Sequence, residues 1–177
     1  MTAGRLVRRR PDPGIESGVA GATGRELLVE GALEVGPVRA GDRARWEVLA
    51  RAYKDFYRTP VAEAEYEATW RRLVRGEDVH GVVARLGGRV VGIAHYLFHA
   101  KFWSPGACYL QDLYVDEAAR GRGAARALIE YVADEARGRG LPRLYWHTQQ
   151  DNAPARALYD RVAKFSGFVR YERALGD

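Results

Sequence analysis

The sequence lacks several features that define large classes of protein. Cys108 is its single cysteine in 177 residues, which excludes an internal disulfide framework and a zinc site built from several cysteines. The uncharged stretch from Val90 to Ala100 is far shorter than the ~20 apolar residues that a membrane-spanning helix needs. The basic first residues are not followed by an apolar segment, as they would be in a secretory signal. We therefore predict a cytoplasmic protein with no membrane partner and no bound metal.

A strong charge imbalance is also missing. The net charge is +5, and part of it comes from Arg8-Arg9-Arg10 near the start of the chain, so the remainder does not favour nucleic-acid binding. Residues 1–30 are rich in glycine and lack apolar periodicity, which predicts a flexible N-terminal tail. The basic cluster in this tail is either a solvated leader or a contact for an acidic surface, and we favour the former. Residues 31–177 then form a single domain.

From Leu33 on, apolar periodicity predicts a mixed α/β sheet with one βαβ unit. Asp42 and Thr59 are the expected N-caps of the first two helices, Gly87-Gly88 predicts a two-residue hairpin turn, and residues 99–106 are an expected loop. The predicted strands cover residues 33–39, 79–86, 89–98, 107–115, 144–148 and 168–173. The predicted helices cover residues 42–56, 61–75, 124–137 and 153–164.

The most informative local pattern is a strand that ends at Val115, a turn with the sequence Arg120-Gly121-Arg122-Gly123, and a long amphipathic helix. Small residues at the start of a helix let an anion approach free backbone N–H groups at the positive end of the helix dipole. An ordinary tight turn would use the same glycines, so the pattern alone is ambiguous. It is neither a Walker A loop, which needs a lysine, nor a dinucleotide fingerprint, which needs a third glycine.

Two motifs together resemble the GNAT N-acetyltransferases. The first runs from Leu110 through the turn to Ala125, with Arg120, Gly123 and Ala125 at the positions of the family's acetyl-CoA motif. The second is Asp151 to Tyr159, closed by Gly167-Phe168. The resemblance covers about residues 33–173. It implies the GNAT α/β fold, a mostly antiparallel central sheet flanked by helices, with strands that splay apart at the cofactor cleft.

The resemblance also implies acetyl-CoA as the cofactor and assigns its contacts. The turn would hold the pyrophosphate, backbone in the preceding strand would pair with the pantetheine arm in the splayed gap, and Asn152 would bind that arm or simply cap its helix. The expected cofactor-binding residues are Leu113, Tyr114, Val115, Arg120, Gly121, Arg122, Gly123, Ala124, Ala125 and Asn152.

The same resemblance suggests two catalytic groups. Tyr159, two helical turns after Asn152, would protonate the departing thiolate as general acid, although a helical tyrosine can also be a packing residue. Asp112 is the candidate general base, acting through water, or else a residue that orients the substrate. Gln111 and Asp112 point to opposite faces of a regular strand, so both can line the cleft only if a bulge intervenes.

The sequence indicates the residues that bind the amine acceptor less clearly. In this family it is bordered by the end of the first helix and by the loop before the motif strand, so the expected substrate residues are Tyr53, Asp55, Phe56 and Trp103. Aromatic rings with one acid would suit an alkylammonium group.

We predict direct acetyl transfer from acetyl-CoA to a primary amine of a small molecule or peptide in a ternary complex, by an enzyme that resembles dimeric members of the family. The alternative is a CoA-binding or nucleic-acid-binding module without turnover.

Overall fold

The computed structural model describes residues 31–175, so the predicted tail at residues 1–30 lies outside the described residues. Within the described part, no helix is both long and apolar enough to cross a membrane. The elements are, in chain order, β1 (Leu33–Pro37), α1 (Arg43–Phe56), α2 (Glu63–Arg75), β2 (His80–Leu86), β3 (Arg89–Lys101), β4 (Ser104–Val115), α3 (Ala124–Gly138), β5 (Leu144–Tyr145) and α4 (Ala153–Val162).

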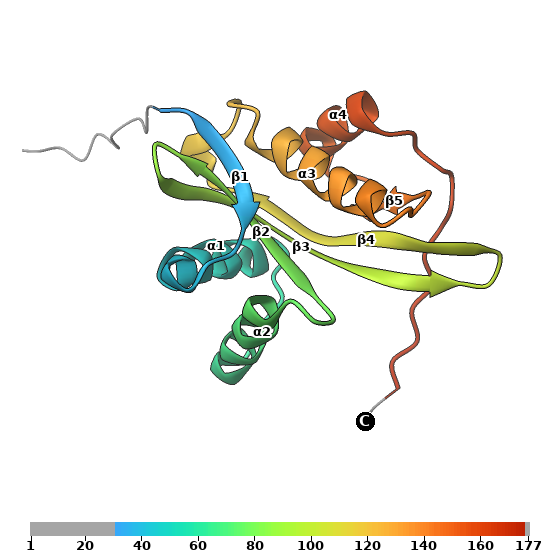
Figure 1. The fold of residues 1–177 in the computed structure, drawn as a ribbon, viewed down its shortest axis with the longest axis horizontal. Helices are drawn as coiled ribbons and strands as arrows, with labels where there is room; N and C mark the ends of the chain where they lie inside the picture. Colours follow the sequence, from blue (N-terminus) through green and yellow to red (C-terminus); the bar gives the residue numbers. More distant parts are fainter. Residues whose placement is uncertain (1–30, 176–177) are drawn as a thin grey trace, which may run out of the picture.

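A five-stranded sheet with the order β1-β2-β3-β4-β5 forms the middle layer. The first four strands pair antiparallel, and only β5 runs parallel to its neighbour β4. Helices α1 and α2 lie on one face of the sheet and α3 lies on the other (Figure 1). This arrangement confirms the predicted mixed, mostly antiparallel sheet flanked by helices.

Each face of the sheet has its own apolar core. On one face, Trp46 of α1 and Trp70 of α2 pack against alternate residues of the central strands, including Ile93. On the other face, Leu128 and Val132 of α3 pack against the opposite alternation. The two periodicities, 3.6 for helices and 2 for strands, therefore bury two separate layers and fix the sheet between them.

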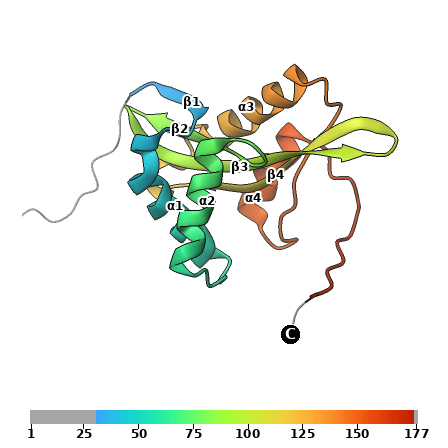
Figure 2. The ribbon, with the colours of Figure 1, turned by 60° about the horizontal axis from the view of Figure 1, so that its bottom comes forward.

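The hairpin predictions were right at one end of β3 and wrong at the other. Gly87 and Gly88 form the expected turn with φ of 56° and 80°, values that glycine adopts without a Cβ penalty. The expected loop at residues 99–106 is instead mostly strand, because β3 and β4 continue to a tight turn. Gly106 permits this continuation, since a Cβ there would lie 2.6 Å from the His99 carbonyl oxygen. The resulting hairpin projects beyond the helices (Figure 2).

Asp42 occupies the predicted N-cap position of α1 but does not cap it with its side chain, whereas the N-cap predicted at Thr59 was wrong. The Asp42 carboxylate pairs with buried Arg85 at 2.5 Å and makes no cap hydrogen bond to α1. The Thr59 hydroxyl donates to the Tyr57 carbonyl, and α2 begins only at Glu63. The ion pair compensates the buried charge of Arg85, which also donates to the Pro37 carbonyl at 3.4 Å, and an uncompensated buried charge is costly.

The C-terminal region departs most from the predicted elements. The strand expected at residues 144–148 is reduced to Leu144–Tyr145, and the last helix ends at Val162. The strand expected at residues 168–173 is extended chain without a ladder partner, and residues 163–175 are all exposed. The alternating pattern is present in the sequence, but a strand also needs a neighbouring edge, and β5 forms a ladder of only two residues.

Candidate active site

A β-bulge in β4 sets the position of the site. The register steps from the pair Tyr96–Leu110 to the pair His95–Asp112, which leaves Gln111 as the extra residue. The bulge reverses the alternation beyond it, so Asp112 turns toward α1 instead of the apolar layer under α3. Gln111 lines a cleft beside the strand. The bulge therefore frees Gln111 and Asp112 from pointing to strictly opposite faces of the sheet. The sequence predicted that both residues could act at one site only with such a bulge.

Asp112 interacts with residues from two elements. Nδ1 of His95 on β3 lies 2.9 Å from Oδ2 of Asp112, and the hydroxyl of Tyr53 on α1 lies close enough to this carboxylate to affect its pKa. The Trp46 indole in turn donates to Nε2 of His95 at 2.8 Å. The side chains of His95 and Asp112 are only 12% and 14% exposed, so these bonds lie largely out of water.

This environment keeps Asp112 ionised. Burial alone would raise its pKa, but the interaction with His95, the nearby charge of Lys54 and the interaction with Tyr53 together lower the pKa below the ordinary value of a carboxyl group. Burial, followed by the Asp112 charge, raises the pKa of Tyr53. Tyr53 therefore stays a neutral donor, and Asp112 stays a carboxylate.

The cleft lies between β4, the end of α1 and α4. Tyr159 of α4 reaches this cleft, and its ring contacts Trp146 with centroids 5.2 Å apart. Burial raises the pKa of the Tyr159 hydroxyl to about 12, so it carries a proton throughout the neutral range. The residues that line the cleft are Tyr53, Tyr57, Leu110, Gln111, Leu113, Trp146, His147 and Tyr159.

The cleft exists because β4 and β5 separate. Their ladder consists of two pairs, Cys108–Leu144 and Tyr109–Tyr145. From Leu110 onward, no strand among residues 31–175 pairs with the β5 side of β4. A ligand amide could therefore satisfy the backbone groups there. This is the splayed geometry that the sequence resemblance implied, and it leaves the Leu113 backbone beside the cleft.

The turn before α3 fits an anionic group. Gly121 and Gly123 adopt φ of 77° and 83°, and a Cβ at either position would meet no atom within 4 Å. Gly123 is the N-cap residue of α3, and no side chain caps this helix end. Backbone N–H groups at the positive end of a 15-residue helix are therefore open to a phosphate. Arg120 stays beside the turn by donating to the Val115 carbonyl at 3.4 Å.

Asn152 sits at the opposite end of α4 from the cleft residue Tyr159. Its Oδ1 accepts from the Ala155 amide at 3.4 Å, and its Nδ2 donates to Thr148 Oγ1 at 3.2 Å. The capping interpretation thus has a direct structural basis. Asn152 does not line the cleft itself, and its contact with the cofactor stays a prediction.

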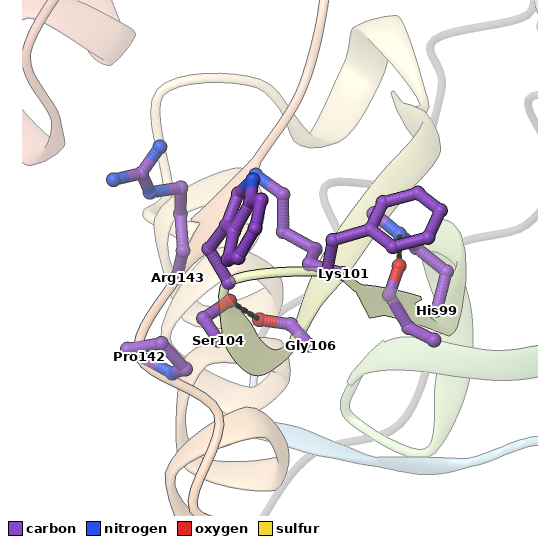
Figure 3. A pocket seen from close by; sticks show the side chains of 9 residues that line it. His99, Lys101, Ser104, Gly106, Pro142 and Arg143 are labelled. Carbon is purple, nitrogen blue, oxygen red and sulfur yellow. Dashed lines mark hydrogen bonds between the residues drawn. The ribbon is translucent and has the colours of Figure 1, made fainter.

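The structure separates the four expected substrate residues. Tyr53 lines the cleft, whereas Asp55 and Phe56 are exposed at the end of α1 and do not line it. Trp103 lies at the tip of the β3–β4 hairpin, where it is 98% exposed. It borders a different hollow of about 430 Å³ with Lys101 and Arg143 (Figure 3). The two hollows share no lining residue, so Trp103 is spatially apart from the residues around Tyr53.

The sequence interpretation missed the partners of Asp112. The sequence did not indicate that His95 contacts Asp112, because the register that sets the two residues opposite each other depends on a bulge. One signal was available: His95 alternates with Ile93 on the face of β3 that packs under Trp46. A histidine on such a face needs a hydrogen-bond partner. No group of three or more potential metal ligands occurs among residues 31–175.

Comparisons with known proteins agree with this architecture. The sequence model of the Acetyltransferase (GNAT) family matches residues 46–165. The D-amino-acid N-acetyltransferase HPA3 of Saccharomyces cerevisiae is 33% identical over 152 residues, which covers 84% of this chain and 94% of the yeast protein.

Solved structures show the same fold at lower identity. A ribosomal-protein-alanine N-acetyltransferase from Brucella melitensis biovar Abortus 2308 superposes with a TM-score of 0.70 at 21% identity, covering 81% of this chain and 100% of the other. AAC(6')-Iy in complex with a CoA-containing bisubstrate analogue superposes with a TM-score of 0.72 at 15% identity, covering 81% and 98%. Because the family match spans most of the chain, this protein belongs to the acetyltransferase (GNAT) family and is an acetyl-CoA-dependent N-acetyltransferase.

Proposed function

We propose that this N-acetyltransferase acetylates the amino group of a free amino acid, directly and in a ternary complex. The observation that carries the proposal is a pair of opposite charges around Tyr53. The Asp112 carboxylate interacts with the Tyr53 hydroxyl, while Lys54 Nζ lies 5.3 Å from the Tyr53 ring and within electrostatic reach of Asp112. A zwitterion presents the matching pair, an ammonium and a carboxylate. The named substrate class of the yeast relative supports a D-amino acid.

The residues around the cleft fit acetyl-CoA. In our proposal the turn from Arg120 to Ala125, which includes Arg122 and the buried Ala124, holds the pyrophosphate. The edge of β4 at Leu113, Tyr114 and Val115 pairs with the pantetheine arm, and Asn152 contacts the same arm. When bound, acetyl-CoA supplies the activated acyl group as a thioester.

Two side chains would move protons. Tyr159 keeps its hydroxyl proton at neutral pH and is suited to donate it to the departing sulfur. Asp112 attracts the acceptor ammonium and takes its proton through the Tyr53 hydroxyl or a water. No protein nucleophile is required, since Cys108 is buried and burial raises its thiol pKa to about 12, which leaves it protonated.

A substrate panel tests the acceptor class. Thiol release from acetyl-CoA should be fastest with free amino acids, D- before L-, and slower with a polyamine or a peptide N-terminus. Lys54→Met should raise the KM for an amino acid but not for a simple alkylamine, and Lys101→Met at the distant hairpin is the matched control. Preference for the polyamine or peptide would overturn the acceptor class, and the absence of thiol release with every amine would favour the non-catalytic module.

The proposed role of Asp112 can be tested with Asp112→Asn, and Asp55→Asn provides a matched control. Asp112→Asn should lower kcat/KM by ~10²-fold or more, as expected for a positioned base. Asp55→Asn removes an exposed carboxylate at the end of α1 and should have little effect. Equal activity of the two variants would remove Asp112 from the chemistry.

We also propose a homodimer. The support is the exposed apolar side chains of residues 163–175, where Phe168 and Tyr171 are 84% and 91% exposed. Isolated apolar side chains are ordinary at a surface, but a run of them is typical of an interface. Sedimentation should give a dimer for the natural chain and a monomer for the double variant Phe168→Ser, Tyr171→Ser. A natural chain that is monomeric at micromolar concentration contradicts this proposal.

Our last proposal concerns location. A cytoplasmic enzyme with a reduced thiol is consistent with the single buried cysteine, since disulfides mark oxidising compartments. Fractionation of cells that express the full chain should recover acetyltransferase activity with cytoplasmic markers.

A further inference from the structure

The hydrogen-bond donors around His95 determine its tautomer. The Trp46 indole N–H can only donate, and it points at Nε2 of His95 from 2.8 Å. Nε2 must therefore accept and carry no hydrogen. The single proton of a neutral imidazole then sits on Nδ1, which faces Oδ2 of Asp112 at 2.9 Å. In this arrangement Nε2 of His95 accepts a hydrogen bond and Nδ1 donates one.

The surrounding core prevents Trp46 from turning away. Trp46 is 1% exposed, its ring centroid lies 5.1 Å from that of Trp70, and the Arg43 guanidinium lies 5.1 Å from its ring. Protonation of Nε2 in His95 would set two N–H donors against each other at hydrogen-bond distance. A close-packed layer offers no room for the indole to relieve that clash, so Nε2 of His95 stays a hydrogen-bond acceptor.

This arrangement has a consequence for Asp112. Its carboxylate accepts the Nδ1–H of His95 and interacts with the Tyr53 hydroxyl on the cleft side, while Lys54 supplies a nearby positive charge. His95, Tyr53 and Lys54 each favour a charged, oriented carboxylate. Tyr109 on the same strand also lies within electrostatic reach, and burial raises its pKa, so it stays an uncharged phenol.

We propose that His95 is a positioning residue for acetyl transfer: fixed as the Nδ1–H tautomer by Trp46, it holds Asp112 as an oriented carboxylate behind Tyr53 at the acceptor side of the cleft. The inference rests on the proposed role of Asp112 in the amine half of the reaction. It adds two residues, Trp46 and His95, that touch neither substrate nor cofactor.

The first test reads the tautomer directly and needs no activity. Nitrogen-15 NMR of the natural full chain should show the His95 proton on Nδ1 and none on Nε2. Trp46→Phe should release this restriction, so that Nε2 gains a proton. Trp70→Phe removes a neighbouring indole that does not contact Nε2 and should leave the tautomer unchanged. A natural protein whose His95 is protonated at Nε2 overturns the proposal.

The second test asks whether the tautomer matters for turnover. His95→Gln keeps one donor and one acceptor, whereas His95→Leu keeps neither. Loss of the donor raises the pKa of Asp112, so the acidic limb of the kcat/KM profile should move up by about one pH unit in His95→Leu and stay in place in His95→Gln. A purely structural role would lower the melting temperature without moving the limb.

The two tests separate the possible failures. An active enzyme with the wrong tautomer, or with an unmoved acidic limb in His95→Leu, contradicts the positioning role while N-acetyltransfer stands. An inactive natural protein with the Nδ1–H tautomer contradicts the proposed function, while the bonding pattern of His95 still stands.

Discussion

The two sides of the cleft are held in place by very different amounts of structure. On the β4 side, Asp112 belongs to a hydrogen-bonded chain through His95 to a tryptophan that is buried between two helices and the sheet. On the α4 side, the helix has no fully buried residue, and Tyr159 meets Trp146 through a ring contact.

This difference matches the roles that we propose for the two side chains. A carboxylate in a partly buried site needs several donors to stay charged and oriented. A phenol needs only to keep its proton, and burial alone achieves that, because it raises the pKa of Tyr159 to about 12. The cleft thus combines a polar side that is held by buried hydrogen bonds with a side that is held by a ring contact, and we propose that the phenol on the second side donates a proton.

Replacing the Tyr159 hydroxyl should have the largest effect. Tyr159→Phe keeps the ring contact with Trp146, so the melting temperature should barely change, while the chemical step should slow by ~10²–10⁴-fold. Single-turnover kinetics measure that step even when product release limits kcat. Tyr57→Phe, another tyrosine of the cleft, is the matched control and should cost far less. A natural rate in Tyr159→Phe would mean that water protonates the sulfur.

Paired leucine truncations test the structural side of the comparison. Leu128→Ala in α3 removes a side chain with 0% exposure and should lower the free energy of unfolding by about 2–5 kcal/mol. Leu158→Ala removes a half-buried leucine of α4 and should cost about 1 kcal/mol. Chemical denaturation measures both. Equal losses would show that α4 is anchored as firmly as α3.

The cofactor turn should be sensitive to a single side chain. Gly123→Val places a β-branched residue at a φ of 83° where the phosphate approaches, so CoA affinity should fall by about 10- to 100-fold, the worth of a hydrogen bond to a charged group. Gly138→Val at the other end of α3 adds a side chain in open space and serves as the control. Calorimetry that gives equal affinities would move the cofactor away from this turn.

Removal of the N-terminal segment should have the smallest effect. We expect a chain that starts near Leu33 to keep its kcat and KM, because residues 1–30 carry no apolar periodicity. Steady-state kinetics and a melting curve on the shortened chain provide the check. A large loss of either activity or stability would show that this segment contacts the domain.

Local chemistry in the sequence predicted much of the cofactor side. Turn glycines, apolar periodicity and the strand–turn–helix pattern predicted α3 to within one residue and the tight Gly87-Gly88 hairpin. These features depend on interactions between residues that are near one another in the chain, where glycine conformation and helical spacing act alone. The N-terminus of α3 at Gly123 is another feature that depends only on residues near one another in the chain.

Only the tertiary structure determined how the residues around Asp112 are arranged. The sequence placed Asp112 on a strand but could not say which face it occupies, because that depends on the bulge at Gln111 and on the pairing of β3 with β4. The same limit explains the exposed segment at residues 168–173, whose alternation suits a strand but has no edge to join. Register and edge pairing are properties of two segments at once, and a shift of one residue reverses every side chain.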